Sequence, residues 1–303
     1  MNFPNIRFEA GHFVDAFVRW LQNAFGGLFE AISAGILWLL LRIEDLLFLM
    51  PWFVIVAVIF LLGWRLVSLW TGIVLAVLIM LIGTFGYWEF MLYTLAIVLG
   101  SVFIAIVLGI PVGIFAAYSS KLDKILRPVL DAMQTMPSFV YLIPAMMLFG
   151  MGKVPAVFAT IIYAIPPVIR LTCLAIRNVP AEMVEAAEAF GSSTWQILRK
   201  IQLPQALPTI MTGVNQTTMM ALSMVVIASM VGAKGLGLEV LNAINKIDVG
   251  RGFESGISIV FLAIIIDRLT QGVINKSQKT KSQKTKSQKT KRALAGKGKS
   301  LWQ

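Results

Sequence analysis

The stretch of sequence that decides the fold reads NVPAEMVEAAEAFGSSTWQILRKIQLPQALP and covers residues 178–208. Its pattern predicts a short helix, a sharp turn and a second helix. Asn178 is a candidate N-cap for the first helix, and Pro180 suits a first helical turn. Gly191 fits the position just past a helix end, where a left-handed backbone costs glycine nothing. Ser193 and the glutamine three residues later have the spacing of a capping box, so a second helix is expected to start there.

Charge and apolar spacing add detail to this helical hairpin. Acidic residues favour the positive N-terminal end of a helix dipole, and the first helix carries three of them: Glu182, Glu185 and Glu188. Steps of four and three residues also give this helix an apolar edge, made of Met183, Ala187 and Phe190. We expect Pro204 to end the second helix or to bend it into the next apolar segment.

Outside this hairpin the composition is that of a chain that needs a bilayer as solvent. Hydrophobic residues make up 58% of the 303 residues and charged residues 14%, whereas soluble domains average about 45–50% and about 25%. The single cysteine, Cys173, excludes an internal disulfide, and the single histidine, His12, excludes an HExxH metal site. The N-terminus lacks the pattern of a cleavable signal peptide, so we expect the transmembrane helices to direct insertion.

Apolar segments recur along the chain, and about 20 apolar residues are needed to cross the hydrocarbon core as a helix. The candidate spans are 46–64, 66–88, 90–120, 132–152, 154–169, 205–233 and 252–271. In the last of these only residues 255–266 are free of charge, so its flanking charges are expected near the interfaces. The sequence therefore predicts an all-α, polytopic transmembrane helix bundle of about seven spans.

The N-terminal region has a different pattern. Polar residues or glycine recur at steps of three and four from His12 to Ser33, while Phe13 and Trp20 lie toward the opposite face. Such a helix either lies flat in the headgroup region or packs on the rest of the protein, and we expect the interfacial position. The predicted organisation is an interfacial region (1–45), two N-terminal spans (46–88), a core (89–272) containing the loop 178–204, and a basic tail (273–303).

The tail repeats the motif KSQKT three times between residues 276 and 290. It has almost no apolar residue to bury, so we expect it to be disordered. A solvated charge run and a contact with anionic membrane lipid remain open, whereas a contact with nucleic acid is not expected next to a membrane span. Gly298-Lys299-Ser300 ends like an ATP-binding Walker A loop, but Ala293 stands where the pattern requires its first glycine.

The hairpin resembles the loop found in permease subunits of binding-protein-dependent ABC importers. That loop is written EAA, three residues, G, nine residues, then I-x-L-P. This chain has Glu185-Ala186-Ala187, Gly191 and Ile201-Gln202-Leu203-Pro204 at those spacings. The resemblance implies a type I ABC importer permease whose hairpin docks, as a coupling helix, in a groove of a cytoplasmic ATPase. The coupling residues that it implies are Glu182, Glu185, Ala186, Ala187, Gly191, Arg199, Ile201, Leu203 and Pro204.

Further stretches look like glycine betaine/proline permeases: MQTMPSFVYLIPA (133–145), YAIPPVIRLT (163–172), EAFGSS (188–193) and ALSMVVIASMVGAKGLG (221–237). This similarity implies that the chain translocates glycine betaine or a related compatible solute (proline, choline or carnitine) by alternating access during osmoprotection. Phe139 and Tyr141 are candidate pathway residues, because a quaternary ammonium group can lie against an aromatic face through a cation–π contact.

The resemblance also implies the partners. They are two cytoplasmic ATPase subunits, an extracytoplasmic solute-binding protein that is a separate chain, and a second copy of the permease. ATP with Mg²⁺ would bind to the ATPases, so we expect no cofactor on this chain and no enzymatic activity of its own. Basic residues concentrate on the side of the loop 170–204 and in the tail. The positive-inside rule then predicts a bacterial cell-membrane protein with its N-terminus outside and its C-terminus in the cytoplasm.

Two other functions stay open at this point. One is a permease for a different small solute, and the other is an ion-coupled secondary transporter. Secondary transporters usually carry ionisable groups at mid-membrane, and the sequence places none securely at that depth. An intramembrane enzyme is disfavoured, because a G-x-S-x-G motif is absent and Asp131 and Asp267 fall at span ends. Dependence on ATP or on an ion gradient would separate the two transporter classes.

Overall fold

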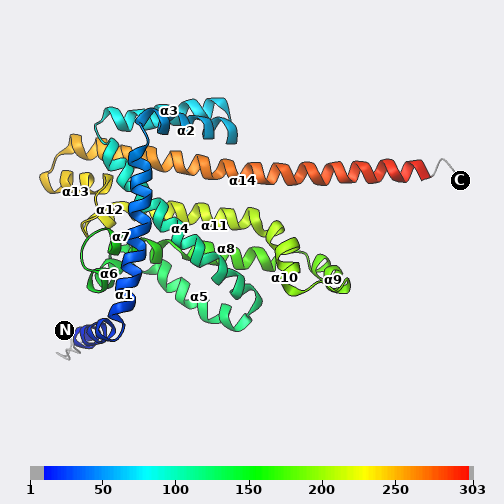
Figure 1. Ribbon diagram of the computed structural model, residues 1–303, viewed down its shortest axis with the longest axis horizontal. Coiled ribbons are helices and arrows are strands. Elements are labelled where there is room, and N and C mark those ends of the chain that lie inside the picture. Colours follow the sequence, from blue (N-terminus) through cyan, green and yellow to red (C-terminus); the bar gives the residue numbers. More distant parts are fainter. Residues whose placement is uncertain (1–9, 300–303) are drawn as a thin grey trace, which may run out of the picture.

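The computed structural model describes residues 10–299 and shows a helical bundle without strands in that range (Figure 1). Three helices run along one direction: α8 (Pro166–Arg177), α11 (Leu203–Ser223) and α14 (Val249–Lys299). α4 (Trp88–Tyr118) packs against α8 and α11. The prediction of an all-α fold is confirmed.

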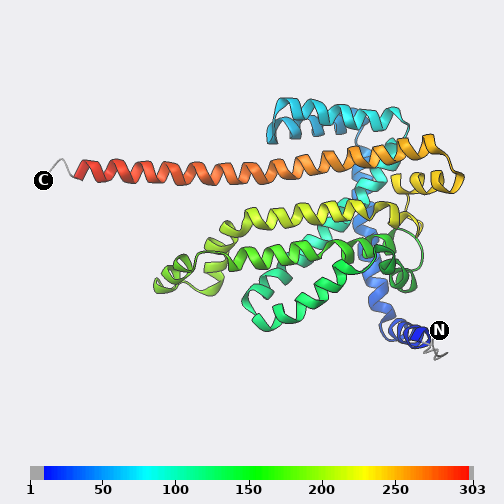
Figure 2. The ribbon, with the colours of Figure 1, turned by 180° about the vertical axis from the view of Figure 1, so that it is seen from behind.

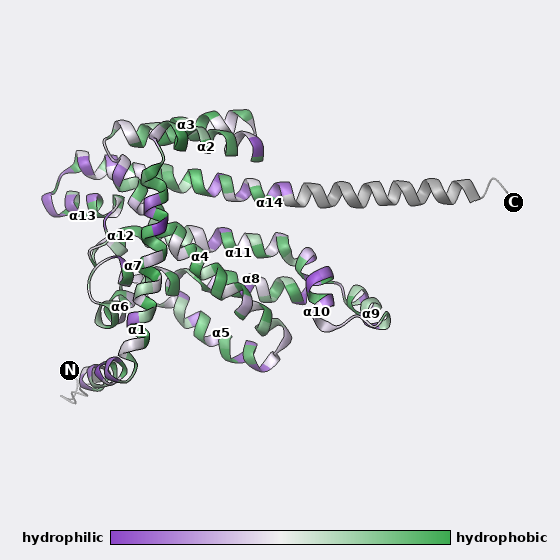
Figure 3. Ribbon diagram, viewed as in Figure 1, coloured by the Kyte–Doolittle hydropathy of each residue, from purple (hydrophilic) through white to green (hydrophobic). Residues whose placement is uncertain are grey.

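The other elements complete the two ends of the bundle. α5 (Ser120–Thr135) starts beside the C-terminal end of α4 and runs back toward α6. The end of the bundle that it reaches carries η1 (Ser138–Tyr141) and α6 (Leu142–Phe149), and also α7 (Lys153–Ala164), α12 (Val225–Ser229) and α13 (Leu236–Lys246). Beside the bundle lies a hairpin of α2 (Trp52–Leu66) and α3 (Leu69–Thr84). In Figure 3 most of the helices between the two ends are apolar, while hydrophilic stretches gather near α10 and α13.

The number of full-length spans is smaller than the sequence suggested. Among the described residues, four helical segments are long and apolar enough to cross a membrane, and the bent α5–α6 segment can count as a fifth. α2 and α3 have 15 and 16 residues, which at 1.5 Å per residue is about 22–24 Å, short of the roughly 30 Å hydrocarbon core. The expectation of full spans at 46–64 and 66–88 is therefore not met. The two helices begin later than predicted, because Pro51 and Ser68 are their N-caps and the residues up to Leu49 belong to α1.

The N-terminal helix α1 (Ala10–Leu49) is kinked at Phe25. Beyond the kink it runs across the direction of α8, α11 and α14 rather than along it, near α6 and α7 (Figures 1 and 2). Lys153 Nζ donates to both carboxylate oxygens of Glu44 at 2.8 and 2.6 Å, which ties α1 to α7. α1 is also long and apolar enough to span a membrane, and its interfacial position stays a prediction.

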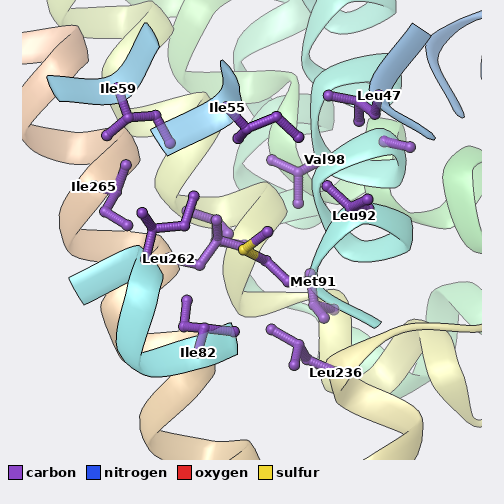
Figure 4. Close-up of a cluster of buried hydrophobic side chains, with 14 of the residues drawn as sticks. Leu47, Ile55, Ile59, Ile82, Met91, Leu92, Val98, Leu236, Leu262 and Ile265 are labelled. Carbon is purple, nitrogen blue, oxygen red and sulfur yellow. The ribbon is translucent and has the colours of Figure 1, made fainter. Parts of the chain in front are cut away.

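A buried apolar cluster joins the α2–α3 hairpin to the bundle. Figure 4 labels ten of its side chains: Leu47, Ile55, Ile59, Ile82, Met91, Leu92, Val98, Leu236, Leu262 and Ile265. Within the hairpin the two helices touch at Gly63 and Gly72, where a Cβ on Gly72 would lie 2.7 Å from the carbonyl oxygen of Phe60. Close backbone approach of this kind holds helices together in lipid, where apolar side chains gain little by leaving the solvent.

α8 packs between α4 and α11 and meets each of them at a glycine. A Cβ on Gly113 of α4 would lie 2.7 Å from the carbonyl oxygen of Ile169, and one on Gly213 of α11 would lie 3.2 Å from the Cα of Val168. Both distances are shorter than an ordinary contact of a Cβ atom. The backbone of α8 is therefore in direct contact with the backbone of α4 on one side and with that of α11 on the other. This fixes the helix that leads into the segment 178–204.

The end of the chain differs from its prediction. The segment 273–303 was expected to be disordered, yet α14 continues as a helix to Lys299 and extends away from the bundle (Figure 1). The repeats contain no proline, and lysine and glutamine are good helix formers. No local signal therefore stops the helix, although its composition offers no apolar face to bury.

Candidate functional site

The hairpin predicted at 178–204 projects from one end of the bundle. It consists of α9 (Ala181–Ala189) and α10 (Thr194–Ile197), followed by a widened π-helical turn, η2 (Leu198–Gln202), that leads into α11. In Figures 1 and 2, α9 and α10 lie beyond the ends of α4 and α5. The hairpin is therefore the element best placed to meet a partner at this end.

The turn between α9 and α10 depends on Gly191. Its φ is +73°, so the prediction of a left-handed glycine is confirmed. The Gly191 N–H donates to the carbonyl of Glu188 at 2.8 Å, and the Ser192 N–H donates to the carbonyl of Ala187 at 3.0 Å. This is the Schellman arrangement, which satisfies the last carbonyls of a helix. The chain can reverse sharply at this point without leaving those carbonyls unpaired.

The predicted start of the second helix is also confirmed. The Ser193 side chain accepts from the Gln196 N–H at 3.4 Å, and the Gln196 side chain accepts from the Ser193 N–H at 3.0 Å, forming a capping box. Pro204 does not end this helix. It lies in the first turn of α11, where its missing N–H is tolerated, and η2 absorbs the change of direction before it.

The predicted cap of the first helix is wrong. Asn178 is the C-cap of α8, directly after its last residue, and α9 begins only after Pro180. The residue before a proline is pushed out of the helical region, so the chain must leave helical geometry at Val179. Two separate helices therefore meet at this point, and Asn178 belongs to the first of them.

Most residues proposed for coupling are accessible in the hairpin. Glu182, Glu185, Ala186, Gly191, Arg199 and Pro204 are exposed, Ile201 and Leu203 are half-buried, and Ala187 is buried. Two aromatic side chains stand out beside them, because Phe190 is 90% exposed and Trp195 is 65% exposed. Phe190 was expected on an apolar edge, but Trp195 was missed. Large apolar side chains gathered on an exposed surface mark an interaction site.

The base of the hairpin is tied to the bundle by Arg177, the last residue of α8. Its Nη1 atom pairs with Asp123 Oδ2 of α5 at 2.6 Å, its Nη2 donates to the carbonyl of Ala116 at 2.8 Å, and its Nε donates to the carbonyl of Ala117 at 3.2 Å. One guanidinium thus satisfies two carbonyls near the C-terminal end of α4, where cations are favourable. In addition, the last residue of α4 donates through its hydroxyl to Gln202 in η2.

The two candidate pathway aromatics differ in their surroundings. Phe139 in η1 is 54% exposed, whereas Tyr141 is 5% exposed. The Tyr141 hydroxyl donates to the carbonyl of Met133, and its ring lies 6.2 Å from that of Tyr163. Tyr141 thus holds the bend between α5 and α6. Of the two, only Phe139 has a ring that is free to meet a solute.

A charged cavity between α5 and α8 was not predicted. Its volume is about 390 Å³, and side chains of both signs line it: Asp123, Arg127 and Asp131 from α5, and Arg170 and Arg177 from α8. The sequence signal was present, because the three α5 charges recur at steps of four residues on one helical face. The predicted spans 90–120 and 132–152 leave these three charges in the connection between them, so the prediction does not group them on one helical face.

Comparison with known proteins identifies the family. The profile described as "Binding-protein-dependent transport system inner membrane component" matches residues 109–276. The chain is 48% identical over 269 residues to the glycine betaine transport system permease protein OpuAB of Bacillus subtilis, covering 88% of this chain and 95% of that protein. It is 48% identical over 256 residues to the glycine betaine/proline betaine transport system permease protein ProW of Escherichia coli, covering 84% and 72%.

Solved structures agree on the fold. The MetNI methionine ABC transporter in an inward-facing conformation aligns with a TM-score of 0.56 and 22% sequence identity, covering 61% of this chain and 93% of that chain. The profile match, the relatives and the helical bundle with its EAA hairpin lead to one assignment. The chain belongs to the family of inner membrane components of binding-protein-dependent transport systems, as an ABC importer permease.

Proposed function

We propose that this chain forms the membrane pathway of an ATP-driven importer for glycine betaine or a related compatible solute (proline, choline or carnitine), active in osmoprotection. The observation that carries the proposal is the projecting hairpin, in which a complete EAA pattern coincides with a glycine-terminated helix and exposed aromatic side chains. The substrate class rests on the relatives, which are named as glycine betaine or proline betaine permeases.

The proposed assembly contains two copies of this chain, two cytoplasmic ATPases that bind ATP with Mg²⁺, and an extracytoplasmic solute-binding protein. The binding protein delivers the solute, and closure of the ATPases moves the hairpins. The permease itself binds no cofactor and carries out no catalysis. Its task is to convert movement of the hairpin into opening of one side of the pathway and closing of the other.

The ties at the hairpin base supply a route for that movement. α8 leads directly into the hairpin and packs against α4 and α11 through glycines, so it cannot shift alone. Arg177 links the same end of α8 to α4 and α5. Displacement of the hairpin is therefore expected to move the α5 end of the pathway together with α8.

The proposed orientation places the hairpin in the cytoplasm of a bacterial cell. Two features support it. The far end of α14 lies on the same side of the bundle as the hairpin, so the C-terminus would also be cytoplasmic (Figure 1). α1 crosses the bundle near α6 and α7, away from the hairpin, which fits an N-terminus outside.

Site-specific crosslinking tests the docking role of the hairpin. A photoreactive amino acid at Phe190 is expected to crosslink to the ATPase in the purified complex. The matched control is Ile247, which is 86% exposed and follows α13 at the opposite end, and which should give no ATPase crosslink. Native mass spectrometry of the same sample should show two copies of this chain. ATPase crosslinks from Ile247 but none from Phe190 would contradict the proposal.

A further inference from the structure

We propose that the cavity between α5 and α8 is a transit site for a zwitterionic solute, whose carboxylate binds Arg170 while its cationic group faces Asp131. The inference rests on the proposed import function and adds a binding site within the permease itself. It is carried by the charge pattern of α5, the size and lining of the cavity, and an unused donor on Arg170.

The charges on α5 indicate contact with water. Arg127 and Asp131 have side chains that are 68% and 63% exposed. Both belong to the first half of a segment, bent by 110°, that is long and apolar enough for a broken span or a re-entrant loop when its two helices are taken together. Charged side chains inside spans line aqueous pathways, because exposure to lipid costs several kcal/mol. Ile125 and Val129, on the other side of α5, are also exposed and suit lipid or a second permease copy. The polar side of α5 therefore borders a water-filled space.

The cavity has the size and chemistry of a small-molecule site. Its volume of about 390 Å³ falls within the roughly 300–1,000 Å³ of typical ligand pockets, which combine apolar walls with a few polar groups. Leu126, Leu130 and Ile169 supply the apolar wall, and the charges of α5 and α8 supply the polar groups. A compact solute with one carboxylate and one quaternary ammonium group finds both a cation and an anion here.

Arg170 is the residue suited to the carboxylate. Its Nη2 pairs with Asp131, but its Nε is buried and has no acceptor among the described residues. A buried donor without an acceptor is costly. A guanidinium binds a carboxylate through two parallel hydrogen bonds, which a lysine cannot reproduce. A solute carboxylate at Nε would satisfy the free donor and leave Asp131 near the cationic group.

A different reading is that these ion pairs only hold α5 against α8. The single cysteine of the chain separates the two readings, because Cys173 lines the same cavity. A thiol reagent that carries a trimethylammonium group reports both access of water to the cavity and competition by a solute of similar shape. A pair that acts only as a tether would not make labelling of Cys173 depend on solute.

The experiment uses the whole complex of permease, ATPase and binding protein in vesicles. Trimethylammonium-ethyl methanethiosulfonate should label Cys173. The labelling rate is compared between two samples that both contain ATP and the binding protein, and it should be lower in the sample that also contains glycine betaine. Cys173→Ser gives the background. In Arg170→Gln and Asp131→Asn the protection should disappear, and maximal uptake should fall about tenfold, equivalent to about 1.4 kcal/mol, while ATP hydrolysis stimulated by loaded binding protein continues. Lys124→Gln, exposed on the same helix outside the cavity, should behave as wild type.

Each contrary outcome has its own meaning. If Cys173 is not labelled in any state, the cavity is closed to water and the inference is wrong. If the rate of Cys173 labelling is the same with and without solute and both variants transport normally, the ion pairs only hold α5 against α8 and the inference is wrong. Asparagine has nearly the shape of aspartate, so Asp131→Asn provides the test alone if the Arg170→Gln permease does not accumulate. If the wild-type complex imports no glycine betaine, the proposed function fails first, which is visible before any variant is compared.

Discussion

At Gly191 the effect of an unfavourable backbone conformation can be tested without the effect of a steric clash. A Cβ built at this position meets no atom within 4 Å, and φ is +73°. Any side chain therefore fits, and only the backbone conformation is penalised. For an ordinary L-residue the left-handed conformation costs about 1–2 kcal/mol, whereas asparagine visits it more readily. Gly191→Val and Gly191→Asn thus form a matched pair that differs mainly in this cost.

The expected effect is on docking and not on the fold. A cost of about 1–2 kcal/mol lowers the population of the native turn by about 5–30-fold relative to alternatives. The hairpin contacts the bundle mainly through its base, so the permease should insert, accumulate and unfold thermally like wild type. The ATPase should bind this permease more weakly, because a smaller fraction of its molecules holds the binding-competent hairpin.

The assay is solute uptake in reconstituted vesicles, with ATPase co-purification measured on the same preparations. Gly191→Val should lose most uptake and much of its ATPase, and Gly191→Asn should retain both. Equal and near-normal activity of the two variants would refute the reasoning that this turn positions a coupling element. A large drop in the amount of Gly191→Val permease would show that the turn matters for folding instead.

Three further predictions concern the same account. Glu185→Lys reverses an exposed charge on α9 and should lower ATPase co-purification at an unchanged permease level; unchanged co-purification would remove Glu185 from the docking surface. Arg177→Met leaves two carbonyls of α4 without their donor and removes one of the two guanidinium partners of Asp123, the other being Arg127. The permease should therefore lose about 1–3 kcal/mol of stability and unfold at a lower temperature in detergent, whereas an unaltered midpoint would argue against the tie. Truncation after Asn275 should preserve uptake, because the repeats have no apolar face. Loss of only its salt response would favour lipid contact, which salt screens, and loss of all uptake would show that the tail is required.

Local signals in the sequence were sufficient for the turn of the hairpin and for the start of its second helix. A glycine past a helix end and a serine three residues before a glutamine each specify a few hydrogen bonds between near neighbours, and both arrangements are present. The span lengths were harder to predict. The apolar run continues through Pro51 and Ser68, so hydropathy does not show where α2 and α3 begin. Helix termini are set by backbone geometry, to which hydropathy is insensitive.

The charged cavity could not be predicted from local sequence patterns, for a different reason. Asp131 and Arg170 are 39 residues apart, and Asp123 and Arg177 are 54 residues apart. Their pairing depends on how α5 folds back along α8 after the turn that follows α4. The charges could be counted in the sequence, but their common location follows only from tertiary packing. The helical course of the tail was missed because a composition without an apolar face was taken to exclude regular structure.

Uptake of labelled glycine betaine into vesicles that contain this chain, its ATPase and the binding protein tests the central claim most directly. The account predicts uptake that requires ATP and the binding protein and that persists when ionophores remove every ion gradient. Uptake that continues without ATP and stops when an ion gradient is removed would contradict it, and would instead identify an ion-coupled transporter.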